Sequence, residues 1–100
     1  GGAQTKVLHF LNDGCKVIKD NLFPIPPLFE MIQQQSKTDW KEMYKVFNMG
    51  HRMEIYTDKE TAKEIIKISQ DFGVEAQIVG RVEEGEKSVE IHSPYGLFTY

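Results

Sequence analysis

Residues 42–56 read EMYKVFNMGHRMEIY, and the expected fold of the surrounding chain depends on how this stretch is interpreted. Apolar residues recur at helical spacing as far as Phe47, and from Met53 onward they alternate with polar ones, which predicts a helix followed by a strand. Asn48 and Gly50 both accept the left-handed backbone that ends helices. From the residues alone, the turn between helix and strand is therefore interpreted as a helix end.

The predicted helix before this turn covers residues 39–47 and carries one apolar stripe at helical spacing, which we expect to lie in the core. The stripe consists of Trp40, Met43, Tyr44 and Phe47. Asp39 followed by Glu42 resembles a capping box and marks the start of the helix.

Other periodic segments give the remaining elements. They predict a short apolar segment at 7–11, strands at 15–19, 50–57, 74–82 and 88–92, and helices at 26–35 and between Thr57 and Gly73. Pro26 and Pro27 suit a first helical turn, and Thr57 to Glu60 form a second capping box. Gly80 is a candidate bulge, and 83–87 a charged hairpin turn.

This order predicts an α+β fold, in which a small mixed β-sheet has helices packed mainly on one face as a two-layer sandwich. If the strands at 50–57 and 74–82 are parallel, the helix between them makes a right-handed crossover. We find no linker or repeat, so residues 1–100 are predicted to form a single domain.

Composition excludes several classes of protein. The formal net charge of -3 and the scattered basic residues argue against nucleic-acid binding. No apolar run approaches the roughly 18 residues of a membrane span. Cys15 is the single cysteine, so no intramolecular disulfide is expected and a cytoplasmic location is favoured. His9, His51 and His92 lack metal-ligand spacing, and no metal site is predicted.

The first residues have two interpretations. Gly1 and Gly2 could allow backbone N–H groups to approach a phosphate, with Gln4 and Thr5 adding side-chain hydrogen bonds. A plain turn explains the same residues. From composition and spacing alone, the chain is an α+β domain of unknown role.

Four segments occur in an order that is informative together. They are GG-Q-T at 1–5, DNLFPIPPLFEMIQ at 20–33, EMYKVFNMG at 42–50 and EAQIVGRVEEG at 75–85. This order strongly resembles the C-terminal domain of the aminoimidazole ribonucleotide synthetase family, also called phosphoribosylformylglycinamidine cyclo-ligase. FNMG following EM is the most specific part of the resemblance. Ala3 and His51-Arg52-Met53 depart from the family's usual pattern.

The resemblance implies an enzyme that uses ATP and Mg²⁺ to close formylglycinamidine ribonucleotide to aminoimidazole ribonucleotide. It implies that an N-terminal domain binds ATP and Mg²⁺, and that this chain is a C-terminal part, inactive alone, of a homodimeric enzyme. The catalytic residues are expected upstream. Substrate-binding residues implied here are Asn48, Met49 and Gly50, and then Gly1, Gly2, Gln4 and Thr5.

Other functions stay open at this point. The same two-domain architecture is expected in formylglycinamidine ribonucleotide synthetase, which would use a related C-terminal domain. A stand-alone α+β ligand-binding module is a non-enzymatic alternative, and a domain that docks on a partner through the Trp40 stripe is another.

Overall fold

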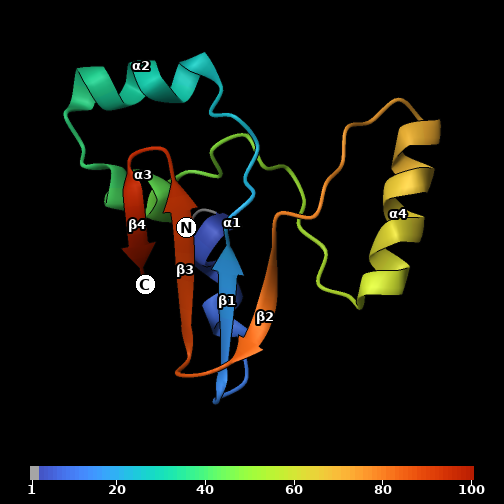
Figure 1. The fold of residues 1–100 in the computed structure, drawn as a ribbon. Helices are drawn as coiled ribbons and strands as arrows, with labels where there is room; N and C mark the ends of the chain where they lie inside the picture. The colour runs from blue at the N-terminus through green and yellow to red at the C-terminus, as the bar shows by residue number, and fades with distance from the viewer. Residues whose placement is uncertain (1–2) are drawn as a thin grey trace.

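The computed structural model describes residues 3–100, and Gly1 and Gly2 lie outside the described residues (Figure 1). Its elements are α1 (Ala3–Lys6), the 3-10 helix η1 (Val7–His9), β1 (Cys15–Lys19), α2 (Pro27–Ser36), α3 (Trp40–Val46), α4 (Lys59–Asp71), β2 (Gly80–Glu84), β3 (Ser88–Ser93) and β4 (Gly96–Thr99).

The four strands form one mixed sheet in the order β2-β1-β3-β4. β1 is antiparallel to β2 and parallel to β3, and β3 is antiparallel to β4. Val17 of β1 therefore lies between Val82 and Val89. The hairpin predicted around residues 83–87 is wrong, because β1 is inserted between the two strands that this turn connects.

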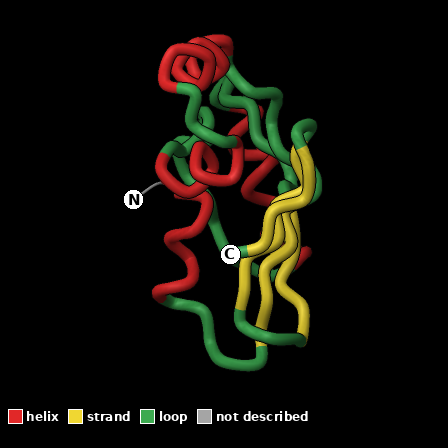
Figure 2. The backbone as a smooth tube through the Cα atoms, turned by 90° about the vertical axis from the view of Figure 1, so that its left-hand side faces the viewer, coloured by secondary structure: helices red, strands yellow, loops and turns green. Residues whose placement is uncertain are grey.

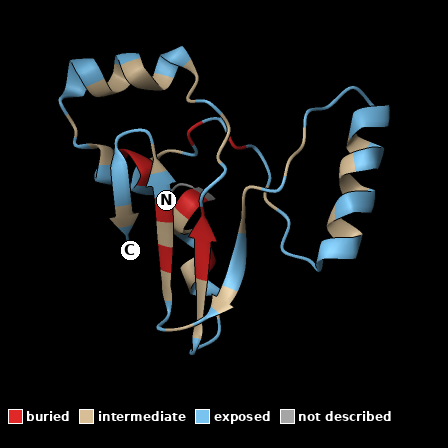
Figure 3. Cartoon of the chain, in the orientation of Figure 1, coloured by how far each residue is buried: buried red, intermediate tan, exposed pale blue. Residues whose placement is uncertain are grey.

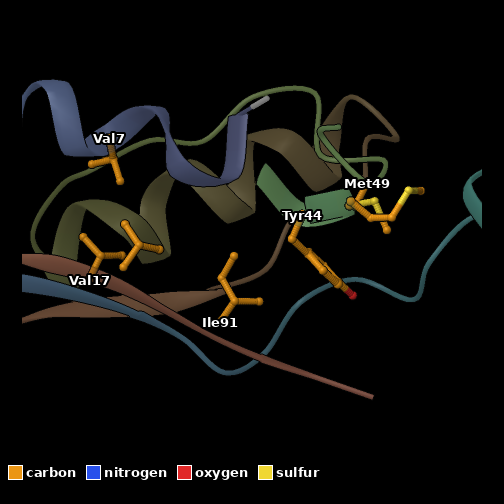
Figure 4. Packing of buried hydrophobic residues seen from close by; sticks show 7 residues of the cluster. Val7, Val17, Tyr44, Met49 and Ile91 are labelled. Carbon is orange, nitrogen blue, oxygen red and sulfur yellow. The ribbon is translucent and has the colours of Figure 1, made fainter. Parts of the chain in front are cut away.

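The predicted two-layer arrangement is confirmed. Helices α1 and α3, with η1, lie on one side of the strands (Figure 1, Figure 2), and the buried strand residues belong to β1 and β3 (Figure 3). The buried hydrophobic cluster consists of Val7, Val17, Met43, Tyr44, Met49, Val89 and Ile91 (Figure 4). Met43 and Tyr44 are fully buried and Trp40 and Phe47 pack against them, so the predicted apolar stripe belongs to the core.

Charged side chains from the strands pair with one another at the sheet. Lys16 Nζ lies 3.4 Å from a carboxylate oxygen of Glu90, and Arg81 Nη1 lies 2.7 Å from Asp20 Oδ2. Lys16 and Glu90 are in the strand phase opposite to buried Val17 and Val89, so they lie on the other face of the sheet.

The helix ends follow the local signals closely. The Asp39 side chain accepts the Glu42 backbone N–H at 2.9 Å, as the capping pattern predicts. At α4 the N-cap is Asp58, whose carboxylate accepts from the Thr61 N–H at 2.8 Å, one residue later than the predicted Thr57. Gly73 has φ 72° directly after the C-cap, as expected for a C′ glycine.

The strand predicted at 50–57 is wrong. Residues 51–58 have no regular secondary structure, and Met53 and Ile55 are 80% and 54% exposed. Glu54, between them, is the side chain that points inward, with 11% of its surface exposed. The alternation is present but its phase is inverted, and without a strand at 50–57 the condition for a right-handed crossover is not met.

The strand predicted at 74–82 begins only at Gly80. Its neighbour β1 ends at Lys19, which pairs with Gly80, so the residues before Gly80 have no strand beside them. Instead the Asn21 side chain donates to the Ile78 carbonyl at 2.8 Å, and Gln77 donates to the Asn21 carbonyl at 2.7 Å. Gly80 is the first residue of β2 and pairs one-to-one with Lys19, so the strand pairing has no bulge at this glycine.

Helix α4 lies to one side of the sheet, beyond the edge strand β2 (Figure 1). Two of its apolar residues, Ile68 and the C-cap residue Phe72, are 57% and 81% exposed. None of the helices within residues 3–100 is both long and apolar enough to cross a membrane.

Gly80 allows β1 and β2 to approach closely. A Cβ at this position would lie 2.0 Å from the Ile18 carbonyl oxygen. We expect Gly80→Ala to lower the free energy of unfolding by about 1–3 kcal/mol or more, because the backbone must shift to admit the methyl group. Urea unfolding followed by circular dichroism measures this. Glu84→Ala on the same strand is the control and should change stability by less than about 0.5 kcal/mol; equal effects would contradict the close approach.

Candidate functional site

Residues 48–51 form a turn separate from the helix end. α3 stops at Val46, and its C-cap Phe47 is extended, with φ −106° and ψ 153°. The His51 N–H donates to the Asn48 carbonyl at 3.0 Å, and the two residues between them, Met49 and Gly50, have φ values of 55° and 91°. The left-handed residues are thus Met49 and Gly50, and the interpretation of Asn48 as part of a helix end is wrong.

Met49 anchors the turn 48–51 in the core. A positive φ is uncommon for a residue with a Cβ and costs roughly 1–3 kcal/mol. The Met49 side chain is 1% exposed and packs among the buried residues (Figure 4). Burial of a methionine side chain contributes about 1.5–3 kcal/mol, which offsets the strain. Asn48 and Gly50, on either side of it, are exposed.

The Asn48 side chain is partly used inside the turn. Its Oδ1 accepts the Gly50 N–H at 2.8 Å, which leaves the side-chain NH₂ group as a donor on the exposed side. A Cβ on Gly50 would lie 2.7 Å from Pro26 Cγ, so this glycine packs directly on the proline that precedes α2. Two motifs far apart in sequence, the Pro-Pro helix start and the FNMG turn, therefore meet in space.

Gln4 contacts the turn 48–51 from the interior of the domain. Its side chain is fully buried, and its Nε2 donates to the Asn48 carbonyl at 3.0 Å. The structure thus brings Gln4 to Asn48, but as an internal contact instead of a surface ligand. Thr5 is half-buried on α1. The predicted roles of Gly1 and Gly2 fall outside the described residues.

A buried polar cluster beside Gln4 was not predicted from the sequence. Lys19, 1% exposed, places its Nζ 2.9 Å from the Gln4 carbonyl oxygen and 3.0 Å from Gln4 Oε1. The same Nζ lies 2.9 and 2.8 Å from the two carboxylate oxygens of Glu54. We call Gln4, Lys19, His51, Glu54 and Tyr56 the Lys19 cluster.

His51 and Tyr56 complete the surroundings of Glu54. His51 is 4% exposed, and its Nδ1 lies 3.5 Å from Glu54 Oε1. The Tyr56 hydroxyl donates to Glu54 Oε2 at 3.1 Å. The rings of Phe23 and His51 pack in a T-shaped arrangement, with 5.3 Å between ring centroids. His51, the last residue of the turn 48–51, therefore lies against the same carboxylate as Lys19.

The cluster keeps its charges by pairing them. Burial lowers the pKa of Lys19, and the Glu54 carboxylate opposes this effect. Burial acts to raise the pKa of Glu54, but the hydrogen bonds from His51, Lys19 and Tyr56, with the Lys19 charge, hold that pKa below its usual value. Tyr56 is 48% exposed, and its partial burial together with the nearby Glu54 charge raises its pKa. A buried ammonium and a carboxylate are tolerated because each has its partner.

A sequence signal for this cluster does exist. In the strand CKVIK, Lys19 shares its phase with Val17, which an amphipathic strand directs into the core. A lysine in that phase needs a buried acceptor. The acceptor is Glu54, between Met53 and Ile55. Its sequence position does not identify it as the partner of Lys19, which only the tertiary structure shows.

A groove of about 550 Å³ lies next to the cluster. Val7, Phe10 and Val82 contribute apolar walls, and Glu54 and Tyr56 line it as well. Cys15, the single cysteine, is half-buried and also faces this groove.

The described residues do not fit a site for Mg²⁺ with ATP. Magnesium in phosphoryl-transfer enzymes is held by carboxylates together with the substrate phosphates. Within residues 3–100, no three or more His, Cys, Asp or Glu side chains gather as metal ligands. No step of the reaction is therefore assigned to a metal in this chain.

Comparison with known proteins identifies the family. Residues 1–93 match the family described as AIR synthase related protein, C-terminal domain. The chain belongs to this family. It is 32% identical over 90 residues to the phosphoribosylformylglycinamidine cyclo-ligase of Lachnoclostridium phytofermentans, which covers 89% of the chain and 26% of that protein. The cyclo-ligase of Methanococcus vannielii is 37% identical over 84 residues, covering 84% of the chain and 24% of that protein.

The cyclo-ligase of Methanopyrus kandleri is 35% identical over 91 residues, which cover 91% of the chain and 26% of that protein. The chain thus spans about a quarter of the length of these curated relatives. The family named from the four ordered segments is confirmed, and the α+β fold is consistent with it.

The Lys19 cluster predicts a specific pH dependence. Because the folded-state pKa of Glu54 lies below its usual value of 4.5, its stabilising contribution is complete above that pH and is lost as pH falls through the folded pKa. At pH 7, Glu54→Gln leaves a buried ammonium without its carboxylate and should lower the free energy of unfolding by roughly 3–5 kcal/mol. Urea unfolding at several pH values from 7 to 3 measures both effects.

The difference in stability between wild type and Glu54→Gln should shrink as the solution is acidified. The carboxyls of Asp20 and Asp58, whose pKa values are also lowered, titrate in both proteins and cancel in the comparison. Glu84→Gln, at an exposed position of β2, is the matched control. A gap between wild type and Glu54→Gln that is independent of pH would contradict the ion pair.

Proposed function

We propose that this chain is the C-terminal part of a cyclo-ligase that closes formylglycinamidine ribonucleotide to aminoimidazole ribonucleotide with ATP. The observation that carries the proposal is the exposed, internally braced turn 48–51, which is also the most specific segment of the family resemblance. The family match and the names of the relatives support the same reaction.

In the reaction that the resemblance implies, ATP phosphorylates the formyl oxygen of the substrate. A nitrogen of the same molecule then attacks this carbon, the ring closes, and phosphate leaves together with the formyl oxygen. ATP and Mg²⁺ would be bound mainly by an N-terminal domain outside the described residues. A homodimeric assembly and a cytoplasmic location are part of this proposal.

The turn would form one wall of the cleft between the two domains. The Asn48 carbonyl accepts from Gln4 and His51, and its Oδ1 accepts from Gly50, so the acceptors of this residue are engaged within the protein. Its side-chain NH₂ remains on the exposed side as a donor. We assign to Asn48 the role of donating a hydrogen bond to an oxygen or nitrogen of the substrate, held in place by the rigid turn.

Among the alternatives, the cyclo-ligase is favoured over formylglycinamidine ribonucleotide synthetase. The three relatives compared above carry the name cyclo-ligase. The exposed turn also gives this domain a surface to share with a second domain, which a self-sufficient binding module does not require.

Asn48→Ala in the full-length enzyme should lower kcat/KM by about tenfold or more, which corresponds to about 1.4 kcal/mol of lost transition-state stabilisation. Steady-state assays of ATP-dependent aminoimidazole ribonucleotide formation measure this effect. Asn12→Ala, at an exposed asparagine in another turn, is the control and should retain wild-type kinetics. An unchanged kcat/KM in Asn48→Ala would reduce the turn to a structural role.

The isolated 100-residue chain should form no aminoimidazole ribonucleotide when supplied with substrate, ATP and Mg²⁺. Phosphoryl transfer needs a metal and charged donors around the transferred group, and residues 3–100 do not assemble them. Adding a separately expressed N-terminal region is the positive arm of the experiment. Formation of aminoimidazole ribonucleotide by the chain alone would contradict the assignment of ATP binding to another domain.

A further inference from the structure

The two ends of the turn 48–51 are tied to a single ammonium group. At the first end, Lys19 Nζ holds the carbonyl and Oε1 of Gln4, and the Gln4 amide in turn donates to the Asn48 carbonyl at 3.0 Å. At the second end, Lys19 holds both oxygens of Glu54, which lies 3.5 Å from Nδ1 of His51. The amide of Gln4 is thereby oriented, because its oxygen is taken by the ammonium.

We propose that Lys19 and Glu54 are positioning residues, whose buried pair fixes the turn 48–51 in the conformation that receives the substrate. The role of the pair toward the turn stands on the contacts above, and its consequence for catalysis rests on the proposed function. Neither residue contacts the substrate in this scheme, since both act through Gln4 and His51.

Stability alone is a poor explanation for this pair. Two charges removed from water lose their hydration, and a well-packed apolar pair of similar size is often equally stabilising. The lysine also stands in the inward phase of β1, in line with Val17, where an apolar residue would fit the strand pattern. An apolar side chain could not orient the Gln4 amide, so the ammonium adds a geometric function that packing cannot supply.

The turn needs such a constraint for a reason that is visible in its backbone. Met49 has φ 55°, a conformation that a residue with a Cβ leaves readily when its neighbours allow it. Gln4 holds the Asn48 carbonyl and Glu54 lies against His51, so the backbone of Met49 between them cannot change conformation without breaking one of these contacts. The direction of the exposed Asn48 amide is then set by the pair.

The double variant Lys19→Met/Glu54→Leu tests the proposal in the natural full-length protein. Each single substitution leaves one buried charge unpaired and perturbs folding, whereas the double variant replaces the pair by apolar side chains of similar size. Its urea midpoint should fall less than that of either single variant, because no buried charge is left unpaired and only the buried Gln4 oxygens lose their donor. Hydrogen exchange of the backbone amides of Gly50 and His51 should become at least about tenfold faster, because both amides donate within the turn.

The kinetic signature of the double variant should be a KM for formylglycinamidine ribonucleotide raised about tenfold, with kcat within about threefold of wild type. This split is expected for a binding interaction present in both the ground state and the transition state. The matched control is Lys16→Met/Glu90→Leu, the same pair of replacements at the 3.4 Å ion pair on the opposite face of the sheet. The control should keep wild-type KM and wild-type exchange in the turn.

Wild-type exchange of Gly50 and His51 in a folded double variant would overturn the positioning role. A lowered kcat with an unchanged KM, or the same effects in the Lys16/Glu90 control, would also overturn it. If the wild-type protein forms no aminoimidazole ribonucleotide, the proposed function fails, and the exchange measurement alone then decides whether the pair holds the turn.

Discussion

An ammonium group in the interior of a domain must find oxygen acceptors, and much of this fold follows from how Lys19 finds them. Four oxygen atoms from Gln4 and Glu54 lie within hydrogen-bond distance of its Nζ. These atoms come from helix α1 and from the irregular segment 51–58, so the end of β1 holds together two parts of the chain that do not pair as strands. The turn 48–51 contacts this junction through Gln4 and Glu54.

The same requirement explains the inverted alternation after the turn. A strand at 50–57 would direct Met53 and Ile55 into the core and Glu54 into solvent. The carboxylate of Glu54 is instead drawn inward by Lys19 at 2.8 Å, and the two apolar side chains face outward. Leaving Lys19 unpaired would cost about 3–5 kcal/mol, and burying both Met53 and Ile55 would contribute roughly 3–6 kcal/mol. The two terms are of similar size, so the ion pair is strong enough to compete with the hydrophobic pattern in this segment.

Features with a local physical cause could be predicted from the sequence. The Asp39 cap, the C′ position of Gly73 and the apolar stripe of α3 depend on residues within a turn or two, and the structure has them. Sheet order depends on distant partners: nothing local indicates that β1 enters between β2 and β3. The same distinction holds for the candidate site. Asn48 and Gly50 could be selected as turn residues from their residue types, whereas the role of Lys19 depends on Glu54, which is distant in sequence.

The buried contacts of the turn also limit what it can offer to a ligand. Met49 occupies the core, and Gln4 and His51 take the Asn48 carbonyl, while Gly50 donates to the Asn48 side chain. The group left facing outward on Asn48 is an NH₂ donor. A donor on a rigid wall suits a substrate rich in carbonyl and phosphate oxygens, because the wall is ordered before binding and loses little further freedom. A ribonucleotide with a formyl group has this acceptor chemistry, so the internal bracing of the turn and the proposed substrate are consistent with each other.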